Sequence, residues 1–155
     1  MTKSNLYILL IMLALMTALT QSTHAVCLDP VTFDSGYHVP LNEEIQSIRQ
    51  IAIGEVIKSR YLQEDSTDPD GITAYIYTVR VLRLLKGQLP EVIELRDEND
   101  SGRYMMEVGE RHLLFLSREG QYFKVNSCGN SSPLILANDV LKQVESILAN
   151  SEKEP

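Results

Sequence analysis

The stretch that decides the fold is Thr73-Ala74-Tyr75-Ile76-Tyr77-Thr78-Val79-Arg80-Val81-Leu82-Arg83-Leu84-Leu85. Its β-branched and aromatic residues are typical of an extended strand, whose side chains alternate between two faces. One face carries Tyr75, Tyr77, Val79 and Val81, and the other carries Ala74, Ile76, Leu82 and Leu84. Because both faces are bulky, we expect a long, coiled strand at the centre of a small barrel.

Shorter apolar segments on either side of this stretch predict the remaining strands. They are Ile51–Ile57, Val92–Leu95, His112–Leu116 and Tyr122–Val125. Gly54 interrupts the first of them, which suggests a β-bulge or tight coiling that lets a small sheet curl. The polar segments between the strands, such as Gln63–Gly71 and Asp97–Gly102, are interpreted as loops. A calcium-loop interpretation of Gln63–Gly71 fails, since both anchoring carboxylates are missing.

Two helices are expected at the ends of the sheet. Leu41–Gln50 has apolar residues at helical spacing and acidic residues in its first turn. A C-terminal helix carries an apolar stripe of Leu136, Val140, Val144 and Ile147. The fold class predicted is mainly β, a five-stranded OB-fold barrel with a short N-terminal helix and a C-terminal helix. A generic secreted β-sandwich is the alternative, but the immunoglobulin type would want about seven strands and a buried Trp, and the chain has no Trp.

The N-terminus has the three-part layout of a secretory signal peptide, residues 1–25. Lys3 precedes the apolar run Leu6–Met16, and a polar segment then leads to a Thr23-x-Ala25 cleavage-like site. An uncleaved transmembrane anchor would need roughly 20 apolar residues, about twice this core. We therefore expect a secreted or periplasmic protein, with one domain over residues 26–150 and a frayed tail over residues 151–155.

Charge excludes two classes of partner. The chain carries a formal net charge of -7, and removal of the leader takes away Lys3 and no acid. Nucleic acid and anionic lipid need clustered Lys and Arg. We therefore expect no nucleic acid and no membrane among the partners after cleavage.

Two cysteines, Cys27 and Cys128, remain after cleavage. In an oxidising compartment such a pair is most simply one disulfide, which would stabilise the fold by up to about 4–5 kcal/mol because it closes a long loop. A metal site or a reactive thiol is the functional alternative. Neither is supported, because there is no Cys-x-x-Cys and because His38 and His112 have no ligand spacing.

Several segments together resemble the netrin-like domain of the tissue inhibitor of metalloproteinases (TIMP) family, especially its bacterial members. The resemblance rests on Cys27 near the mature start with the helix after it, the strand Ile51–Val56, the segment Tyr77–Gly87 ending in Lys-Gly, and Val108–Phe115 followed by Asn126-Ser127-Cys128-Gly129. These segments span nearly the whole mature chain. Their order and spacing are more specific than any one of them alone.

The chain departs from the family in its cysteines. The family opens with Cys-x-Cys, and the resemblance implies that Cys27 is the later of the two, paired with Cys128. The earlier cysteine then aligns with Ala25, and its expected partner with Ser101 before Gly102. In animal inhibitors that earlier cysteine is the first mature residue and chelates the protease zinc. Here Val26 would be first and would lack the second bridge.

The resulting expectation is an exported, non-enzymatic TIMP-like binding module without a cofactor or metal, acting as a monomer. No catalytic residues are expected, because hydrolase, zinc-protease and phosphate-loop motifs are all missing. By analogy with the family, a partner-binding rim is predicted at Val26, Cys27, Leu28, Ser101 and Gly102. The partner would be a secreted metalloprotease or another exported protein. The alternative function is a metalloendopeptidase inhibitor acting through its N-terminal segment.

Overall fold

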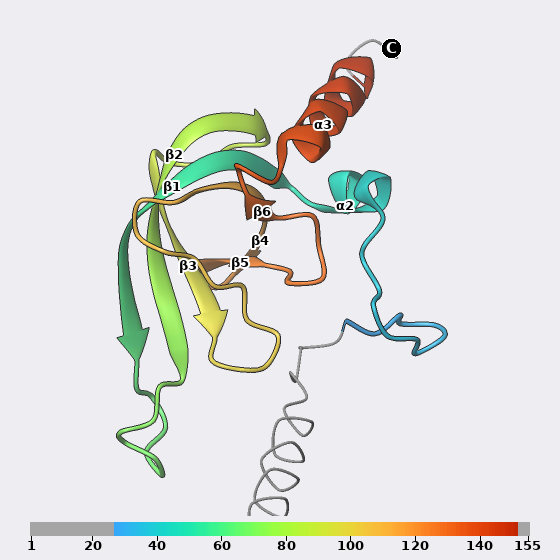
Figure 1. Cartoon of the computed structure of the whole chain (residues 1–155). Coiled ribbons are helices and arrows are strands. Elements are labelled where there is room, and N and C mark those ends of the chain that lie inside the picture. The colour runs from blue at the N-terminus through green and yellow to red at the C-terminus, as the bar shows by residue number, and fades with distance from the viewer. Residues whose placement is uncertain (1–26, 152–155) are drawn as a thin grey trace, which may run out of the picture.

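The computed structural model describes residues 27–151, so the predicted leader (residues 1–25) and Val26 lie outside the described part of the chain. These residues form a mainly β structure, with six strands in one sheet and two helices (Figure 1). In chain order the elements are α2 (Leu41–Ser47), β1 (Gln50–Leu62), β2 (Ala74–Lys86), β3 (Val92–Glu98), β4 (Arg111–Glu119), β5 (Tyr122–Val125), β6 (Ser132–Pro133) and α3 (Asn138–Ser151). Neither helix of this described part is long and apolar enough to cross a membrane.

The strand pairing closes a ring of five strands. Neighbours in the sheet follow the order β1-β2-β3-β5-β4-β6, and β1 pairs with β4 as well as with β2. All pairings are antiparallel except that of β3 with β5, which meet in parallel at Leu95 and Phe123. The short strand β6 adds to β4 beside the ring.

Gly54 lies where β1 changes register against β2, so the bulge predicted at this position is confirmed. A Cβ atom at Gly54 would overlap the Cγ1 of Val79 and would lie 3.2 Å from the Cδ1 of Leu114. Glycine therefore allows β1 to approach β2 and β4 at the same point, which a larger residue would prevent.

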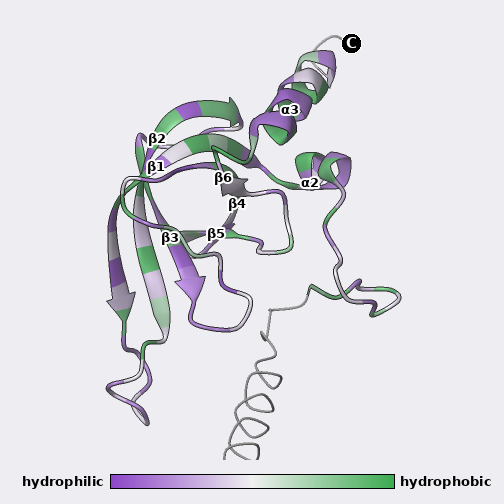
Figure 2. Cartoon of the chain, in the orientation of Figure 1, coloured by the Kyte–Doolittle hydropathy of each residue, from purple (hydrophilic) through white to green (hydrophobic). Residues whose placement is uncertain are grey.

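Apolar side chains form two cores, one on each face of the sheet. The first draws on all five strands of the ring and contains Val56, Tyr77, Val79, Ile93, Leu95, Met106, Leu114, Leu116 and Phe123. The second lies between the sheet and the two helices and contains Ile45, Ile51, Ile53, Leu113, Phe115, Ala137 and Val144. Figure 2 shows apolar (green) stretches on β1, α2 and α3, which contribute residues to this core. Because β4 supplies residues to both cores, its apolar run is continuous rather than alternating.

The elements differ from the sequence-based expectation at their ends. α2 ends at Ser47, not Gln50, because Gln50 already pairs with Leu116 in β4. Lys86 holds this helix end by donating hydrogen bonds to the carbonyl oxygens of Ile45 and Ile48. β1 continues to Leu62, five residues beyond the predicted strand.

The predicted C-terminal stripe is wrong at its first residue. Leu136 precedes α3, and its backbone amide donates to the carbonyl of Pro133 in a turn. The side chain of Leu136 is 77% exposed, and Ala137 is the buried residue at this position. α3 itself extends to Ser151, the first residue of the expected tail.

Replacing Gly54 with Ala is expected to lower the free energy of unfolding by about 1–3 kcal/mol, because the added methyl group must displace the stiff side chain of Val79. The matched control is Gly102→Ala, whose added Cβ would meet nothing closer than 3.4 Å. Urea unfolding of the two variants and the wild type measures the difference. Equal stability of the Gly54 and Gly102 variants would show that β1 has room at the bulge.

Candidate functional site

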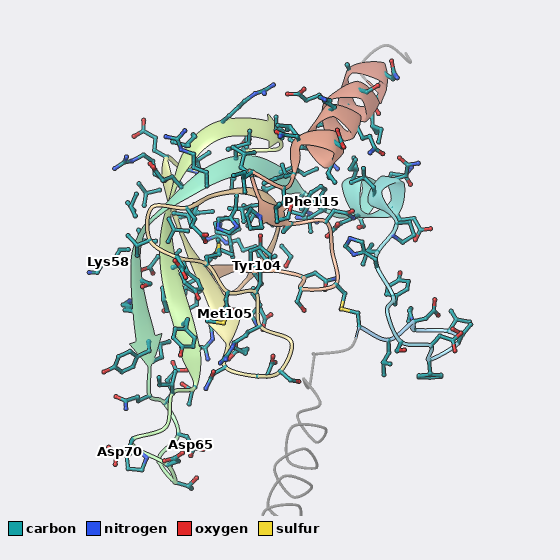
Figure 3. The ribbon with its side chains drawn as sticks, in the orientation of Figure 1. Lys58, Asp65, Asp70, Tyr104, Met105 and Phe115 are labelled. Carbon is teal, nitrogen blue, oxygen red and sulfur yellow. A yellow bond between two sulfur atoms is a disulfide. The ribbon has the colours of Figure 1, made fainter. Side chains whose placement is uncertain are left out.

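A disulfide joins Cys27 to Cys128, as predicted, and links residues 101 positions apart in the sequence. The two Cα atoms lie 5.6 Å apart. Figure 3 shows the bridge between the N-terminal segment and the loop that follows β5. A disulfide is consistent with a chain that folds outside the cytoplasm.

Backbone hydrogen bonds extend the attachment on both sides of the bridge. The carbonyl of Cys27 accepts hydrogen bonds from the amides of Gly36 and Tyr37, each at 2.9 Å. The carbonyl of Cys128 accepts from the amide of Val39 at 2.9 Å and lies 2.8 Å from the Nδ1 of His38. The N-terminal segment is therefore held at both of its ends beside the loop at Cys128.

A buried carboxylate fixes the far side of this loop. Glu44 of α2 is 4% exposed, and its Oε2 accepts hydrogen bonds from the backbone amide and the side-chain amide of Asn130, both at 2.7 Å. The Asn130 side chain also donates to the carbonyl of Val39. A Cβ at Gly129 would overlap the Glu44 carboxylate, so glycine is needed for the close approach. A buried polar side chain is tolerated here because it is hydrogen-bonded.

The N-terminal segment presents apolar side chains to solvent. Leu28 is 54% exposed, Val31 is 82% exposed and Phe33 is 73% exposed. Their arrangement is set by Asp29, whose Oδ1 accepts hydrogen bonds from the amides of Val31 and Thr32 and thereby closes the turn. Leu28 of the predicted rim thus lies on a compact turn, together with two further apolar residues.

The loop after β3 reaches the same region through Ser127. A Cβ at Gly102 would lie 3.5 Å from the Oγ of Ser127, the residue before Cys128. Gly102 and Ser127 line a recess of about 230 Å³, with Asp97, Asp100 and Asn126 among its other walls. Ser101 is exposed beside it. The structure therefore brings the predicted Ser101–Gly102 loop next to the bridge, whereas Val26 lies outside the described residues.

A hydrogen-bonded network around the buried His112 holds the end of this loop. The hydroxyl of Tyr104 lies 2.9 Å from the Nδ1 of His112, and the Nε2 of His112 lies 3.2 Å from the Oε2 of Glu110. Because the Glu110 carboxylate can only accept, Nε2–H donates to it and Nδ1 accepts from the Tyr104 hydroxyl. Burial lowers the pKa of His112, although Glu110 opposes the shift, and it raises the pKa of Tyr104. The neutral imidazole therefore fixes Tyr104 in place.

Asp97, near the end of β3, has a partly buried carboxyl group with only one of its two oxygens hydrogen-bonded within residues 27–151. Its Oδ1 accepts a hydrogen bond from the amide of Tyr104 at 3.0 Å, while its Oδ2 is buried and lacks a hydrogen-bond partner among the described residues. Burial raises the pKa of Asp97 to about 6, and the nearby charge of Asp100 adds to the effect, while Arg103 opposes it. The folded state consequently binds this proton more tightly than the unfolded state does.

In these arrangements the polar side chains are hydrogen-bonded to one another or to the backbone. His112 is fully buried and its two nitrogens are occupied by Tyr104 and Glu110. Within residues 27–151 there is no group of three His, Cys, Asp or Glu side chains placed to hold a metal ion. Sequence reasoning did not single out Val31, Phe33 or Tyr104, and it interpreted Asp97 as a solvated acid of a loop, whereas Asp97 Oδ2 is buried. A histidine opening the apolar run His112–Leu116 was the one available signal of a buried polar contact.

Replacing both Cys27 and Cys128 with Ser is expected to lower the free energy of unfolding by about 2–5 kcal/mol, since the bridge constrains the unfolded chain. Urea unfolding without reductant compares the variant with the wild type. Reducing the wild type should bring it to the stability of the double variant. A wild type that loses nothing on reduction would contradict a stabilising role for the bridge.

Asp97→Asn tests the raised pKa. A carboxyl group whose pKa is about 6 in the folded state, against an ordinary value of 3.8, stabilises the folded state on protonation. That stability is complete below the ordinary value and is lost as the pH rises through 6. Asn stays neutral throughout. The unfolding free energy of the variant minus that of the wild type should therefore fall by about 1–2 kcal/mol from pH 7.5 to pH 4.5, discounted for partial exposure. A difference that does not vary with pH would contradict the assignment.

Comparison with known proteins gives no family assignment. No protein-family model and no curated protein sequence matches the chain.

Proposed function

We propose that this chain is an exported, non-catalytic binding module of the netrin-like, TIMP-related type, with an OB-fold barrel as its core. Three features support the fold: a closed ring in the order β1-β2-β3-β5-β4, a parallel contact between β3 and β5, and a bent first strand with glycine at its bulge. A helix lies before the ring and another after it, which agrees with the order expected from the resemblance.

The observation that carries the function is the exposed, covalently held N-terminal turn. Leu28, Val31 and Phe33 are all more than half exposed, although the segment that bears them is fixed by the Cys27–Cys128 bridge and by backbone hydrogen bonds. Rigid, exposed apolar side chains make good contacts for a partner, because little conformational freedom is lost when they bind. The Ser101–Gly102 loop lies beside Ser127, at the bridge end of this segment.

The backbone of Phe33 adds support. Its φ is 61°, in the left-handed region that a bulky non-glycine residue rarely adopts. An exposed Phe in this backbone conformation does not stabilise the fold. Asn or Gly would adopt the same conformation at a lower free-energy cost. Such strain is typical of positions retained for contact with a partner.

The second candidate function is inhibition of a secreted metalloendopeptidase. It is favoured by the placement of Cys27, which is bonded to Cys128, the residue after the Ser127 that lies beside Gly102. In this candidate function the α-amine of the residue before Cys27 would be the zinc ligand. An amine can bind zinc only when it is deprotonated and held in position. Without the second family bridge, ordering this terminus would cost binding free energy.

Phe33→Asn separates the role of the rim from that of the fold. Asn tolerates the left-handed region, so the variant should be at least as stable as the wild type in urea unfolding. It should nevertheless lose most binding to partners that immobilised Val26–Pro155 captures from exported proteins of its own source. As the control, Leu136→Asn alters an exposed apolar residue that precedes α3 and should keep that binding. Equal capture by the wild type and the Phe33 variant would contradict the proposed rim.

Assay of Val26–Pro155 against secreted zinc proteases decides between the two candidates. We expect no inhibition at micromolar concentration. Inhibition that is abolished by acetylation of the α-amine would overturn this preference in favour of the zinc-chelating inhibitor. Inhibition that survives acetylation but is lost in Phe33→Asn would place a protease among the partners of the rim without chelation.

A further inference from the structure

The C-terminal half of β1, from Lys58 to Leu62, has a neighbouring strand on one side only in the described part of the chain. β4 pairs with β1 from Gln50 to Glu55, and the last bonds on that side join Val56 to the turn at Gly109 and Glu110. Beyond that point β1 continues to Leu62 with β2 alone as its neighbour within the described residues. Figure 1 shows this half of β1 at the edge of the sheet, separated from the N-terminal segment.

Hydrogen bonds fix which backbone groups face outward on this edge. The Leu62 carbonyl accepts from the amide of Thr73, so the backbone of Leu62 faces β2. The register between β1 and β2 runs without a shift from Lys58 to Leu62, and backbone direction alternates along a strand. Lys58 and Arg60 therefore also face β2, whereas the N–H and C=O groups of Ser59 and Tyr61 point away from it.

A second hydrogen bond gives the same assignment from the other side of β2. The amide of Val81 donates to the carbonyl of Glu91, so the odd-numbered residues of β2 face β3. Its even-numbered residues, which include Ile76 and Thr78, face β1 and are the register partners of Arg60 and Lys58. The four outward groups of Ser59 and Tyr61 thus form a short template for one more strand.

Charge along the edge is positive in the middle and negative at the ends. Lys58 and Arg60 are exposed on one face, and Lys58 projects outward from β1 (Figure 3). Arg60 lies 3.6 Å from Glu94, both partners being well exposed. Acidic residues lie beyond both ends: Glu107 and Glu110 in the turn next to Val56, and the acids of the loop that follows Leu62, two of which, Asp65 and Asp70, are labelled in Figure 3.

This charge pattern disfavours a second copy of the chain as the occupant. Two copies of β1 pairing antiparallel through Ser59 and Tyr61 would place Arg60 opposite Arg60, or Lys58 opposite Arg60 in the neighbouring register. Like charges directly opposite one another are destabilising, and lysine on an edge is a common protection against self-association. The same two cations favour a strand that brings carboxylates to both positions.

We propose that the free edge of β1 binds an extended segment of another protein as an added antiparallel strand, with two acidic side chains at alternating positions opposite Lys58 and Arg60. The residue between those acids would face the side of the sheet that carries Ser59 and Tyr61, and apolar character suits it because Tyr61 is 58% exposed there. Residues beyond the two acids would be neutral or basic, to match the acidic ends of the edge. This surface is independent of the N-terminal rim.

The peptide Lys-Thr-Val-Glu-Val-Glu-Val-Thr-Lys is the probe, and a second peptide with both Glu residues replaced by Lys is its control. Fluorescence anisotropy with Val26–Pro155 should show saturable binding of the first peptide only. Lys58→Glu/Arg60→Glu should weaken that binding by at least about tenfold and should bind the control peptide instead. A far-UV circular dichroism spectrum equal to that of the wild type checks that the variant folds. Arg83→Glu/Lys142→Glu changes the net charge equally and should leave the preference unchanged.

Amide hydrogen exchange tests the backbone contacts separately. In the free protein the amides of Ser59 and Tyr61 should exchange fast and that of Arg60 slowly; the acidic peptide should slow Ser59 and Tyr61 by at least about tenfold. The proposal is overturned by the absence of saturable binding, by equal weakening in both double variants, or by protection at residues other than those of β1. It is supported only if the exchange of preference and the protection of Ser59 and Tyr61 occur together.

Discussion

Pairing of β1 with both β2 and β4 is the constraint on which the rest of the structure depends. A strand can serve two neighbours in a closed ring only if it bends, and β1 bends at Gly54, where neither Val79 nor Leu114 leaves space for a side chain. Closing the ring buries one face of β4, and its other face, with Leu113 and Phe115, must then be covered from outside. α2 and α3 supply that cover, so their packing follows from the ring.

Much of this could be predicted from patterns in the sequence. Alternation from Tyr75 to Val81 identifies β2, and a glycine inside a β-branched run locates the bulge of β1. The disulfide followed from the number of cysteines, Cys27 and Cys128 being the only two in the chain. Each of these signals is local, or depends on composition, and needs no knowledge of which segments meet in space.

The remaining features depend on contacts between distant segments, which periodicity does not encode. Ile48 continues the helical spacing of α2, yet the helix stops because Gln50 is taken up by β4. Tyr104 and His112 follow no motif, and they meet because a turn at Gly109 reverses the chain between them. The exposure of Val31 and Phe33 depends on a turn closed by one side chain, Asp29. The sequence alone does not distinguish an apolar residue in an exposed turn from one in the core.

The disulfide has a consequence for the order of events during biosynthesis. A chain that is synthesised, or moved through a pore, from its N-terminus presents Cys27 first and Cys128 only after the residues of β1 to β5 have passed. Since Cys128 is the only other cysteine of the sequence, Cys27 cannot form an internal disulfide until that whole length has emerged. An oxidant that acts early therefore finds no internal partner to join wrongly. The covalent link can form only once every strand of the ring is present to bring its two ends together.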